Sequence, residues 1–392
     1  MAGKLGDLRA PILAGLVATV TGTAASMGVV LTGFNSIGAT PAQSISMVAI
    51  MLAIYGGLSI ILSLAFKMPL SIVWSTPGAA LLLASGSLHL NFQNVVGAFV
   101  FTGAMLVLTG LWPALGRLVM RVPKSIASAM LAGVIYAFCV APFVTASQYW
   151  QIILPVLVVW LVLYRFAMVW AAPVAILLCY VLISIDLHVT VDVASIVPQI
   201  SLVTPTFSWQ AIVGVGIPLY LVTMASQNIP GIAIMKSFGY EVPFRPTMIA
   251  TGAGSLIATL FGGYAVNLAA ITAAINANEQ AHKNPAKRWI AAVAGGVFYL
   301  VMAITAGATV SFVLQVPHEL LLASSGIALF ATIASAFANI VEVPDQRLAA
   351  VIAFLVASSG VSFFGVGSAF WALMAGILVW QVLEVRTKAN PV

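Results

Sequence analysis

Three short stretches interrupt an otherwise apolar sequence with residues that can contact a ligand. They are Trp-Ser-Thr-Pro-Gly at 74–78, Ser-Gln-Asn at 226–228 ahead of Pro230, and Gly-Gly-Tyr-Ala-Val-Asn at 262–267. Pro77 disfavours helix for the residue before it and suits the first turn of a helix that follows. In the third stretch two glycines break a helix and an alanine-rich segment follows. We expect ligand contact at all three stretches, and we expect Pro230 to open its helix.

The composition requires a membrane environment. Of 392 residues, 62% are hydrophobic and 6% are charged, and the mean hydropathy is +1.13. Since a soluble domain carries about a quarter charged residues, these values exclude a soluble enzyme, a nucleic-acid-binding protein and a disordered protein. Cys139 and Cys179 lie in apolar runs and predict neither a disulfide nor a metal site. No cofactor is expected.

The chain divides into about fourteen candidate membrane spans when it is cut at charges, Pro and Gly, because a spanning helix needs roughly 20 apolar residues. The spans are expected at 11–32, 45–66, 69–86, 92–116, 125–145, 148–165, 167–187, 209–235, 246–262, 264–277, 288–314, 320–340, 347–364 and 367–385. The segments at 69–86 and 264–277 are short or broken. The first apolar run is too long for a cleaved signal peptide, so a retained span is expected there.

The distribution of basic residues tests this division. Loops that alternate from a cytoplasmic N-terminus place all fifteen Lys and Arg residues inside and none outside. The outside loops contain a few acids and the histidines His89, His188 and His318. A wrong number of spans would mix the two sets of loops. The sequence therefore predicts an even number of spans with both termini in the cytoplasm.

Two weak similarities between the halves indicate an internal repeat. Val-Pro-Lys at 122–124 is similar to Val-Pro-His at 316–318, and Ala-Ser at 25–26 recurs at 225–226. A repeat of seven spans crosses the membrane an odd number of times, so its two copies must be inverted. Inverted repeats place the binding site near the midplane, at interrupted helices in corresponding positions.

The first and third stretches predict an anion site made of peptide dipoles. Ser75 or Thr76 can cap a short helix, and residues 264–277 supply a second one. Each helix N-terminus offers free N–H groups and about half a positive charge. No Lys or Arg lies in the middle of a predicted span, and the acidic residues lie at span ends or in loops. Since a cation transporter is expected to carry a buried carboxylate, the pattern favours an anionic or neutral substrate.

The sequence resembles the benzoate:proton symporter family of bacterial inner membranes along its whole length. The likeness is carried by W-S-T-P-G-A-A-L-L at 74–82, L-V-T-M-A-S-Q-N-I-P-G-I-A at 221–233, A-A-I-T-A-A-I at 269–275 and G-S-A-F-W-A-L-M-A-G at 367–376. The resemblance implies the uracil-permease-like fold of the nucleobase–ascorbate transporter type. That fold is all-α, with fourteen segments in two inverted seven-segment repeats, here expected at 1–200 and 201–392. A core domain and a gate domain are each built from both repeats.

The resemblance also implies which residues bind the substrate. They are Ser75, Thr76 and Gly78 on the third segment, Ser226, Gln227 and Asn228 on the eighth, and Tyr264, Ala265, Val266 and Asn267 on the tenth. Nucleobase carriers of this fold usually have glutamates on the eighth and tenth segments, where this chain has Ser226 or Gln227, and Val266. Loss of two carboxylates suits a substrate that brings its own negative charge. The coupled proton could travel on the substrate, or on Glu279 or His282.

We therefore expect a secondary transporter, not an enzyme, that imports benzoate or a related aromatic carboxylate with a proton by alternating access. The carboxylate would lie at the two helix N-termini, near Thr76–Gly78 and Ala265–Asn267. Gln227 and Asn228 would add hydrogen bonds, and the ring would pack on Tyr264. One proton per substrate removes the cost of moving a charge against the membrane potential, about 2.3 kcal/mol per 100 mV. The expected partners are the substrate, the proton, the bilayer and, as an option, a second copy of the chain.

Several alternatives stay open from the sequence. A passive anion channel could use the same dipoles, and a nucleobase permease could use the same scaffold. A membrane enzyme would need converging titratable groups or metal ligands, which four separate histidines do not supply. No G-x-x-x-x-G-K-[ST] loop is present to indicate ATP drive. The three stretches also have ordinary structural interpretations: a proline kink, polar contacts between helices, and a Gly-rich loop.

Overall fold

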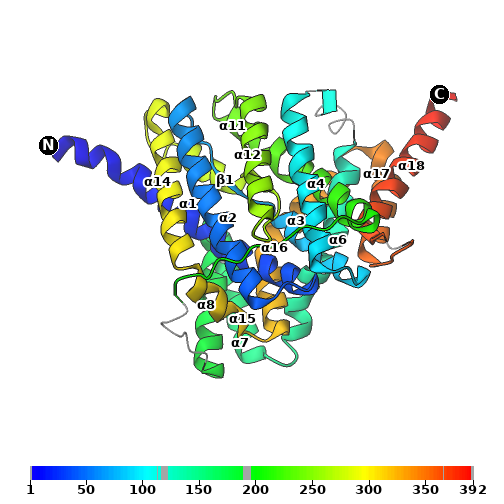
Figure 1. Cartoon of the computed structure of the whole chain (residues 1–392), viewed down its shortest axis with the longest axis horizontal. Helices are drawn as coiled ribbons and strands as arrows, with labels where there is room; N and C mark the ends of the chain where they lie inside the picture. Colours follow the sequence, from blue (N-terminus) through cyan, green and yellow to red (C-terminus); the bar gives the residue numbers. More distant parts are fainter. Residues whose placement is uncertain (1, 113, 116–121, 189–195, 365, 390–392) are drawn as a thin grey trace.

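The computed structural model describes residues 2–112, 114–115, 122–188, 196–364 and 366–389 and is almost entirely helical (Figure 1). These residues form fourteen successive segments, as the sequence predicts. Seven of the described helices are long and apolar enough to cross a membrane, and the other segments are shorter or broken. The chain is thus a multi-span, all-α membrane protein.

The fourteen segments divide equally between the two halves of the chain. The first half contains α1 (Ala2–Ser36), α2 (Pro41–Phe66), β1 (Ile72–Trp74) with α3 (Thr76–Ser85), α4 (Phe92–Leu111), α6 (Lys124–Thr145), α7 (Trp150–Phe166) and α8 (Met168–Leu187). The second half contains α9 to α11 in one continuous helix (209–237), α12 (Phe244–Thr259), β2 (Val266–Leu268) with α13 (Ile271–Ala277), α14 (Trp289–Ile304) with α15 (Ala306–Leu314), α16 (His318–Glu342), α17 (Arg347–Ser358) and α18 (Ser368–Ala389). Each half therefore has its broken segment in third place.

Two predicted spans end earlier than expected. The span predicted at 92–116 ends at Leu111, because Pro113 disfavours helix for the residue before it. The span predicted at 347–364 ends just before Gly360, whose φ of +65° lies in the left-handed region that commonly terminates a helix. Both differences arise from local backbone preferences and leave the order of segments unchanged.

The helices pack as two bundles. In the first bundle α2 packs on α14, α4 packs on α12, and α1 lies against α14 and α3. In the second bundle α6 packs on α16 and α17, α7 on α8, and α17 on α18. Exchange of the two halves converts the α2–α14 pair into the α12–α4 pair, as inverted repeats require. Figure 1 shows α14, α1 and α2 toward one end of the long axis and α17 and α18 at the other.

An extended connection joins the two halves and crosses the first bundle. Residues 196–208, part of the green trace in Figure 1, pass the ends of α2, α12 and α4. Ser201 N donates to Ser46 Oγ at 3.0 Å, and Val203 N donates to the Leu260 carbonyl at 2.8 Å. A further backbone bond joins this strap to the start of α4. The strap therefore ties three helices of the first bundle together.

Glycine allows α2 and α14 to approach closely. A Cβ atom on Gly56 would lie 2.6 Å from the Gly296 carbonyl oxygen and 2.8 Å from the Leu300 side chain. A Cβ atom on the neighbouring Gly57 would meet no atom within 4 Å. The two adjacent glycines thus differ in whether packing requires them.

Gly56→Ala is expected to cost about 1–3 kcal/mol in the free energy of unfolding, because the added methyl group forces α2 and α14 apart. Gly57→Ala is the matched control and is expected to be neutral or stabilising by up to about 1 kcal/mol, since Ala favours helix over Gly. Thermal unfolding of the detergent-purified proteins, followed by tryptophan fluorescence, measures both. Equal unfolding temperatures for the two variants would contradict the packing assigned here.

Candidate functional site

The first interruption is a strand that leads directly into a short helix. Pro77 lies in the first turn of α3, where its missing N–H is not needed. Ser75 caps this helix, since its Oγ accepts a hydrogen bond from Gly78 N at 3.1 Å. Thr223 Oγ1, from the eighth segment, donates to Ser75 Oγ at 3.0 Å. The predicted cap is confirmed at Ser75, and it also joins the third segment to the eighth.

The second interruption stays extended for longer than the sequence predicts. Strand β2 occupies Val266–Leu268, and α13 begins only at Ile271 and has seven residues. The prediction of a helix N-terminus at Ala265–Asn267 is therefore wrong. The physical reason is antiparallel pairing with β1, in which Val73 lies opposite Asn267. Pairing with a distant strand satisfies the backbone here in place of a helical turn.

Serine side chains complete the hydrogen bonds at the outer edges of the strand pair. Ser59 Oγ of α2 accepts from Ile72 N at 2.9 Å. Ser255 Oγ of α12 accepts from Val266 N, also at 2.9 Å. The two serines occupy corresponding helices of the two halves. Non-helical backbone at this depth is tolerated because its polar groups find partners within the protein.

Asn228 attaches the eighth segment to β2. Its Oδ1 accepts from Leu268 N at 3.0 Å, and its Nδ2 lies 3.4 Å from Met224 Sδ. Ser226 Oγ donates to a carbonyl of its own helix. Gln227 is half-buried, and its side chain forms no hydrogen bond within the part of the chain that the structure describes. Of these three predicted site residues, Gln227 alone has its polar atoms free for a ligand.

The eighth segment stays helical through its prolines, so the predicted opening at Pro230 is wrong. Two π-turns precede the prolines, at Ile212–Gly216 before Pro218 and at Met224–Asn228 before Pro230. In each turn the residue before the proline donates to the carbonyl five residues back. This wider turn accommodates a ring that would clash with an α-helical carbonyl. The second π-turn places Asn228 against β2.

Tyr264 holds the first interruption in place. It is fully buried, and its hydroxyl donates to the Ser75 carbonyl at 3.2 Å. Its ring packs against Phe34 and Phe99, with centroid separations of 5.4 and 6.0 Å. These contacts give Tyr264 a positioning role. Contact between its ring and a substrate stays a prediction.

Asn267 is a polar side chain of β2 that has no hydrogen-bond partner in the described part of the chain. Its relative exposure is 0%, and neither Oδ1 nor Nδ2 has a hydrogen-bond partner. The register places it on the same face of the strand pair as Val73. Buried amides in proteins are almost always hydrogen-bonded, and each exception calls for an explanation such as a ligand. Asn267 is therefore the residue best placed to receive one.

The loop after α13 holds the two residues predicted for proton coupling, away from the break. Glu279 is exposed, whereas His282 is buried and its Nδ1 accepts from Asn284 N at 2.9 Å. Arg288, which the sequence analysis did not single out, is buried and donates to the carbonyls of Ala277 and His282 at 2.7 and 2.8 Å. A basic residue soon after a short helix is the signal that indicates such a cap.

Tyr240 lies beside this cap. Its hydroxyl donates to the Pro285 carbonyl at 2.7 Å. Burial raises the pKa of Tyr240, and the opposing effect of Arg288 is smaller. Tyr240 therefore stays neutral at physiological pH, and Arg288 keeps its charge at the end of α13.

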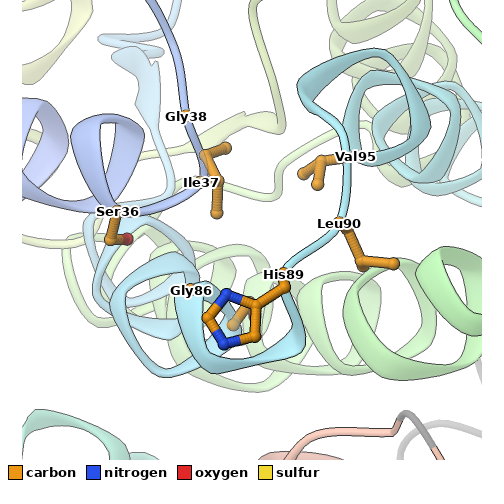
Figure 2. A pocket seen from close by; sticks show the side chains of 8 residues that line it. Ser36, Ile37, Gly38, Gly86, His89, Leu90 and Val95 are labelled. Atoms are coloured by element: carbon orange, nitrogen blue, oxygen red, sulfur yellow. The ribbon is translucent and has the colours of Figure 1, made fainter.

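A surface cavity of about 260 Å³ lies at the opposite end of α3 from the break. Figure 2 shows Ser36, Gly86 and His89 among the residues around it. Since the ten residues of α3 span about 15 Å, this cavity is separate from the capped N-terminus at Ser75. The predicted site residues are gathered at the break and not at this surface cavity.

These features define the class of protein. Two broken segments in corresponding positions meet inside inverted halves, and polar side chains of a third segment join them, which is an architecture of membrane transporters. The model of the family described as benzoate membrane transport protein matches residues 8–382. The chain belongs to this family of transporters, so it is not an enzyme, and the resemblance found at the three stretches is confirmed.

Two relatives extend over nearly the same length. The chain is 37% identical over 381 residues to inner membrane protein YdcO of Escherichia coli K12, with 97% of each chain covered. It is 33% identical over 339 residues to the benzoate membrane transport protein of Acinetobacter baylyi, with 84% of each covered. These relatives support a multi-pass protein of a bacterial inner membrane.

Solved structures show the same fold at low sequence identity. The transmembrane domain of the cyanobacterial bicarbonate transporter BicA has a TM-score of 0.62 at 15% identity, covering 95% of this chain and 97% of that one. The murine anion transporter Slc26a9 in its inward-facing state has a TM-score of 0.62 at 13% identity, covering 97% of this chain and 68% of that one. At this level of sequence identity the two likenesses show a shared fold.

Asn228→Ala is expected to cost about 1–3 kcal/mol in the free energy of unfolding, because it leaves the Leu268 N–H without a partner. Gln227→Ala is the matched control and should cost less than about 0.5 kcal/mol, since Gln227 has no hydrogen bond to lose. Thermal unfolding gives the stabilities, and hydrogen exchange of peptides covering β2 reports on the Leu268 amide. Similar exchange of that amide in both variants would argue against the assigned bond.

Proposed function

We propose that this chain imports benzoate or a related aromatic carboxylate, together with a proton, across the bacterial inner membrane. The observation that carries the proposal is the buried, unpartnered amide of Asn267 at a break shared by two segments. Membership of a family of benzoate membrane transport proteins supports the substrate class. A small carboxylic acid suits a single amide in an apolar surrounding, because the acid is itself mostly apolar.

The proposed site has two kinds of residues. Contacts to the substrate are assigned to Thr76, Gln227 and Asn267, with the positive end of α3 nearby. The break itself is formed and held by Ser75, Gly78, Asn228, Tyr264, Ala265 and Val266. The remaining proposed residue, Ser226, donates to a carbonyl of its own helix. The first set is expected to change affinity, and the second set is expected to change both affinity and stability.

The first bundle is proposed as the core domain and the second bundle as the gate, each built from repeats at 1–200 and 201–392. Helices α1 and α3 of the core contact α16, α8 and α6 of the gate. A Cβ atom on Gly28 of α1 would lie 2.8 Å from Ser325 Oγ and 3.2 Å from the Tyr180 hydroxyl. Glycine thus allows close contact at the surface where core and gate would slide. Such movement would open the break alternately to the two sides of the membrane.

Coupling to a proton gives the cycle its direction. A carboxylate entering a cell with a negative interior works against the potential, at about 2.3 kcal/mol per 100 mV. One proton carried with each carboxylate makes the cycle neutral and lets the pH gradient drive uptake. This requirement distinguishes the proposed symporter from a passive channel on the same scaffold.

Reconstituted protein is expected to accumulate labelled benzoate when the liposome interior is more alkaline than the medium. Asn267→Leu should reduce the initial rate at least tenfold, because it removes the proposed polar contact, whereas Gly57→Ala, away from the break, should transport like wild type. Uptake that only equilibrates, with or without the gradient, would indicate a channel. Uptake of labelled uracil in place of benzoate would indicate a nucleobase permease.

Both termini are proposed to lie in the cytoplasm. A C-terminal fusion to green fluorescent protein should fluoresce in cells, and a C-terminal alkaline phosphatase fusion should be inactive. Phosphatase fused after residue 200 should be active, because the connection between the halves would lie outside. The opposite pattern of phosphatase activity would overturn the proposed orientation.

A further inference from the structure

We propose that the break binds the aromatic acid in its protonated, neutral form, and that the amide of Asn267 pairs with the carboxyl group. The substrate itself then carries the coupled proton. This inference rests on the proposed function and adds to it the chemical state of the substrate and the origin of proton coupling.

The hydrogen-bonding pattern of Asn267 favours the neutral acid. Its buried amide presents unpaired N–H donors on Nδ2 and an unpaired acceptor, Oδ1, side by side. A carboxylic acid presents one O–H donor and one carbonyl acceptor side by side, so the two groups can form a pair of hydrogen bonds. A carboxylate has acceptors only. It would satisfy Nδ2 but would place a negative oxygen beside Oδ1.

The backbone N–H groups that were expected to bind an anion are already used. Val266 N donates to Ser255 Oγ, and Leu268 N donates to Asn228 Oδ1. At the start of α3, Gly78 N donates to Ser75 Oγ. The second helix N-terminus does not lie at Ala265–Asn267, because residues 266–268 form a strand and α13 begins only at Ile271. The break therefore offers an anion much less positive potential than two facing helix N-termini would.

Fixed cations lie at helix ends and not at the break. On the segments around β1 and β2, three basic residues are exposed at helix ends: Lys67, Lys236 and Arg245. The fourth, Arg288, is buried and donates to two backbone carbonyls. A carboxylate buried at Asn267 would have no cationic partner, and a buried unpaired charge normally takes up a proton instead. The surroundings thus favour protonation of the substrate.

Side chains that could carry the proton at neutral pH are missing close to the strand pair in the described chain. The elements packed there are α2, α12, the π-turn at 224–228 and α1, whose Ser26 Oγ accepts from Trp74 Nε1 at 2.7 Å. They contain no Asp, Glu or His apart from Asp7, which lies about five helical turns before Ser26 near the start of α1. The titratable groups beside the strands are Tyr55 and Tyr264, which remain protonated because tyrosine has an ordinary pKa of about 10. The basic residue of α12, Arg245, is always charged. The carboxyl group of the substrate is then the group that titrates.

Binding of the neutral acid lowers the apparent affinity at neutral pH, because most of the substrate is ionised in solution. A carboxyl group with an ordinary pKa of about 4 is neutral in roughly one molecule per thousand at pH 7. Apparent affinity must therefore fall about tenfold for each pH unit above that pKa. Each acid molecule that binds brings one proton, so coupling needs no separate proton-carrying residue.

Calorimetry of the purified full-length protein tests this inference with benzoate and benzamide as probes. Between pH 5.5 and 8, the Kd of benzoate is expected to rise about tenfold per pH unit, and buffers of different ionisation enthalpy should reveal uptake of about one proton per benzoate. Benzamide has the same shape, a donor and an acceptor, and no titratable proton in this range. It should bind with a Kd that does not change with pH.

The outcomes separate this inference from the proposed function. Benzoate binding that is independent of pH, without proton uptake, would overturn the neutral-acid proposal and leave the transporter proposal intact. Failure of benzamide to bind would also overturn the neutral-acid proposal. So would a benzamide affinity that falls with pH as the benzoate affinity does, because the titrating proton would then belong to the protein. Failure of both probes at every pH would overturn the proposed function itself.

Asn267→Leu tests the assigned partner. It should weaken both probes at least tenfold, because both use the amide of Asn267. Unchanged affinity for both would exclude Asn267 as the partner. The thermal unfolding temperature of the variant, compared with Asn228→Ala, separates loss of binding from loss of the fold, because Asn267 has no hydrogen bond within the protein to lose.

Discussion

Every backbone polar group inside a membrane protein must find a partner within the protein, and this constraint shapes the centre of the molecule. Two segments are extended over part of their length, so the N–H and C=O groups there cannot pair within their own segment. Strands β1 and β2 pair with each other, and Ser59, Ser255 and Asn228 complete their outer edges. Because the pairing joins residues from the two halves, the centre forms only when both halves are assembled.

The same constraint explains why one break could be predicted closely and the other could not. At the first break, Pro77 and Ser75 act on their immediate neighbours, so four residues of sequence suffice to place the start of α3. At the second break, Val266–Leu268 directly precede an alanine-rich helix, and the strand that holds them extended is almost two hundred residues away. Helix propensity is a local property, and pairing across the repeats overrides it.

The number and order of the spans follow from hydropathy and from the distribution of basic residues, because both report on the bilayer rather than on packing. The roles of individual polar residues do not follow in this way. Asn228 and Asn267 look equivalent as amides in apolar sequence. Asn228 accepts a hydrogen bond from a backbone N–H, whereas Asn267 has no partner among the described residues. Only the register of β2 distinguishes them, and the register is set by residues of the other half.

The strap at residues 196–208 limits which parts of the molecule can move. It is bonded to α2, α12 and α4, all of which belong to the first bundle. The strap therefore joins helices of both halves of the chain within the first bundle. The alternating access proposed above would then take place at the contact between the two bundles, where Gly28 of α1 lies against α8 and α16. The segment that links the two repeats thus also cross-links the helices of the first bundle.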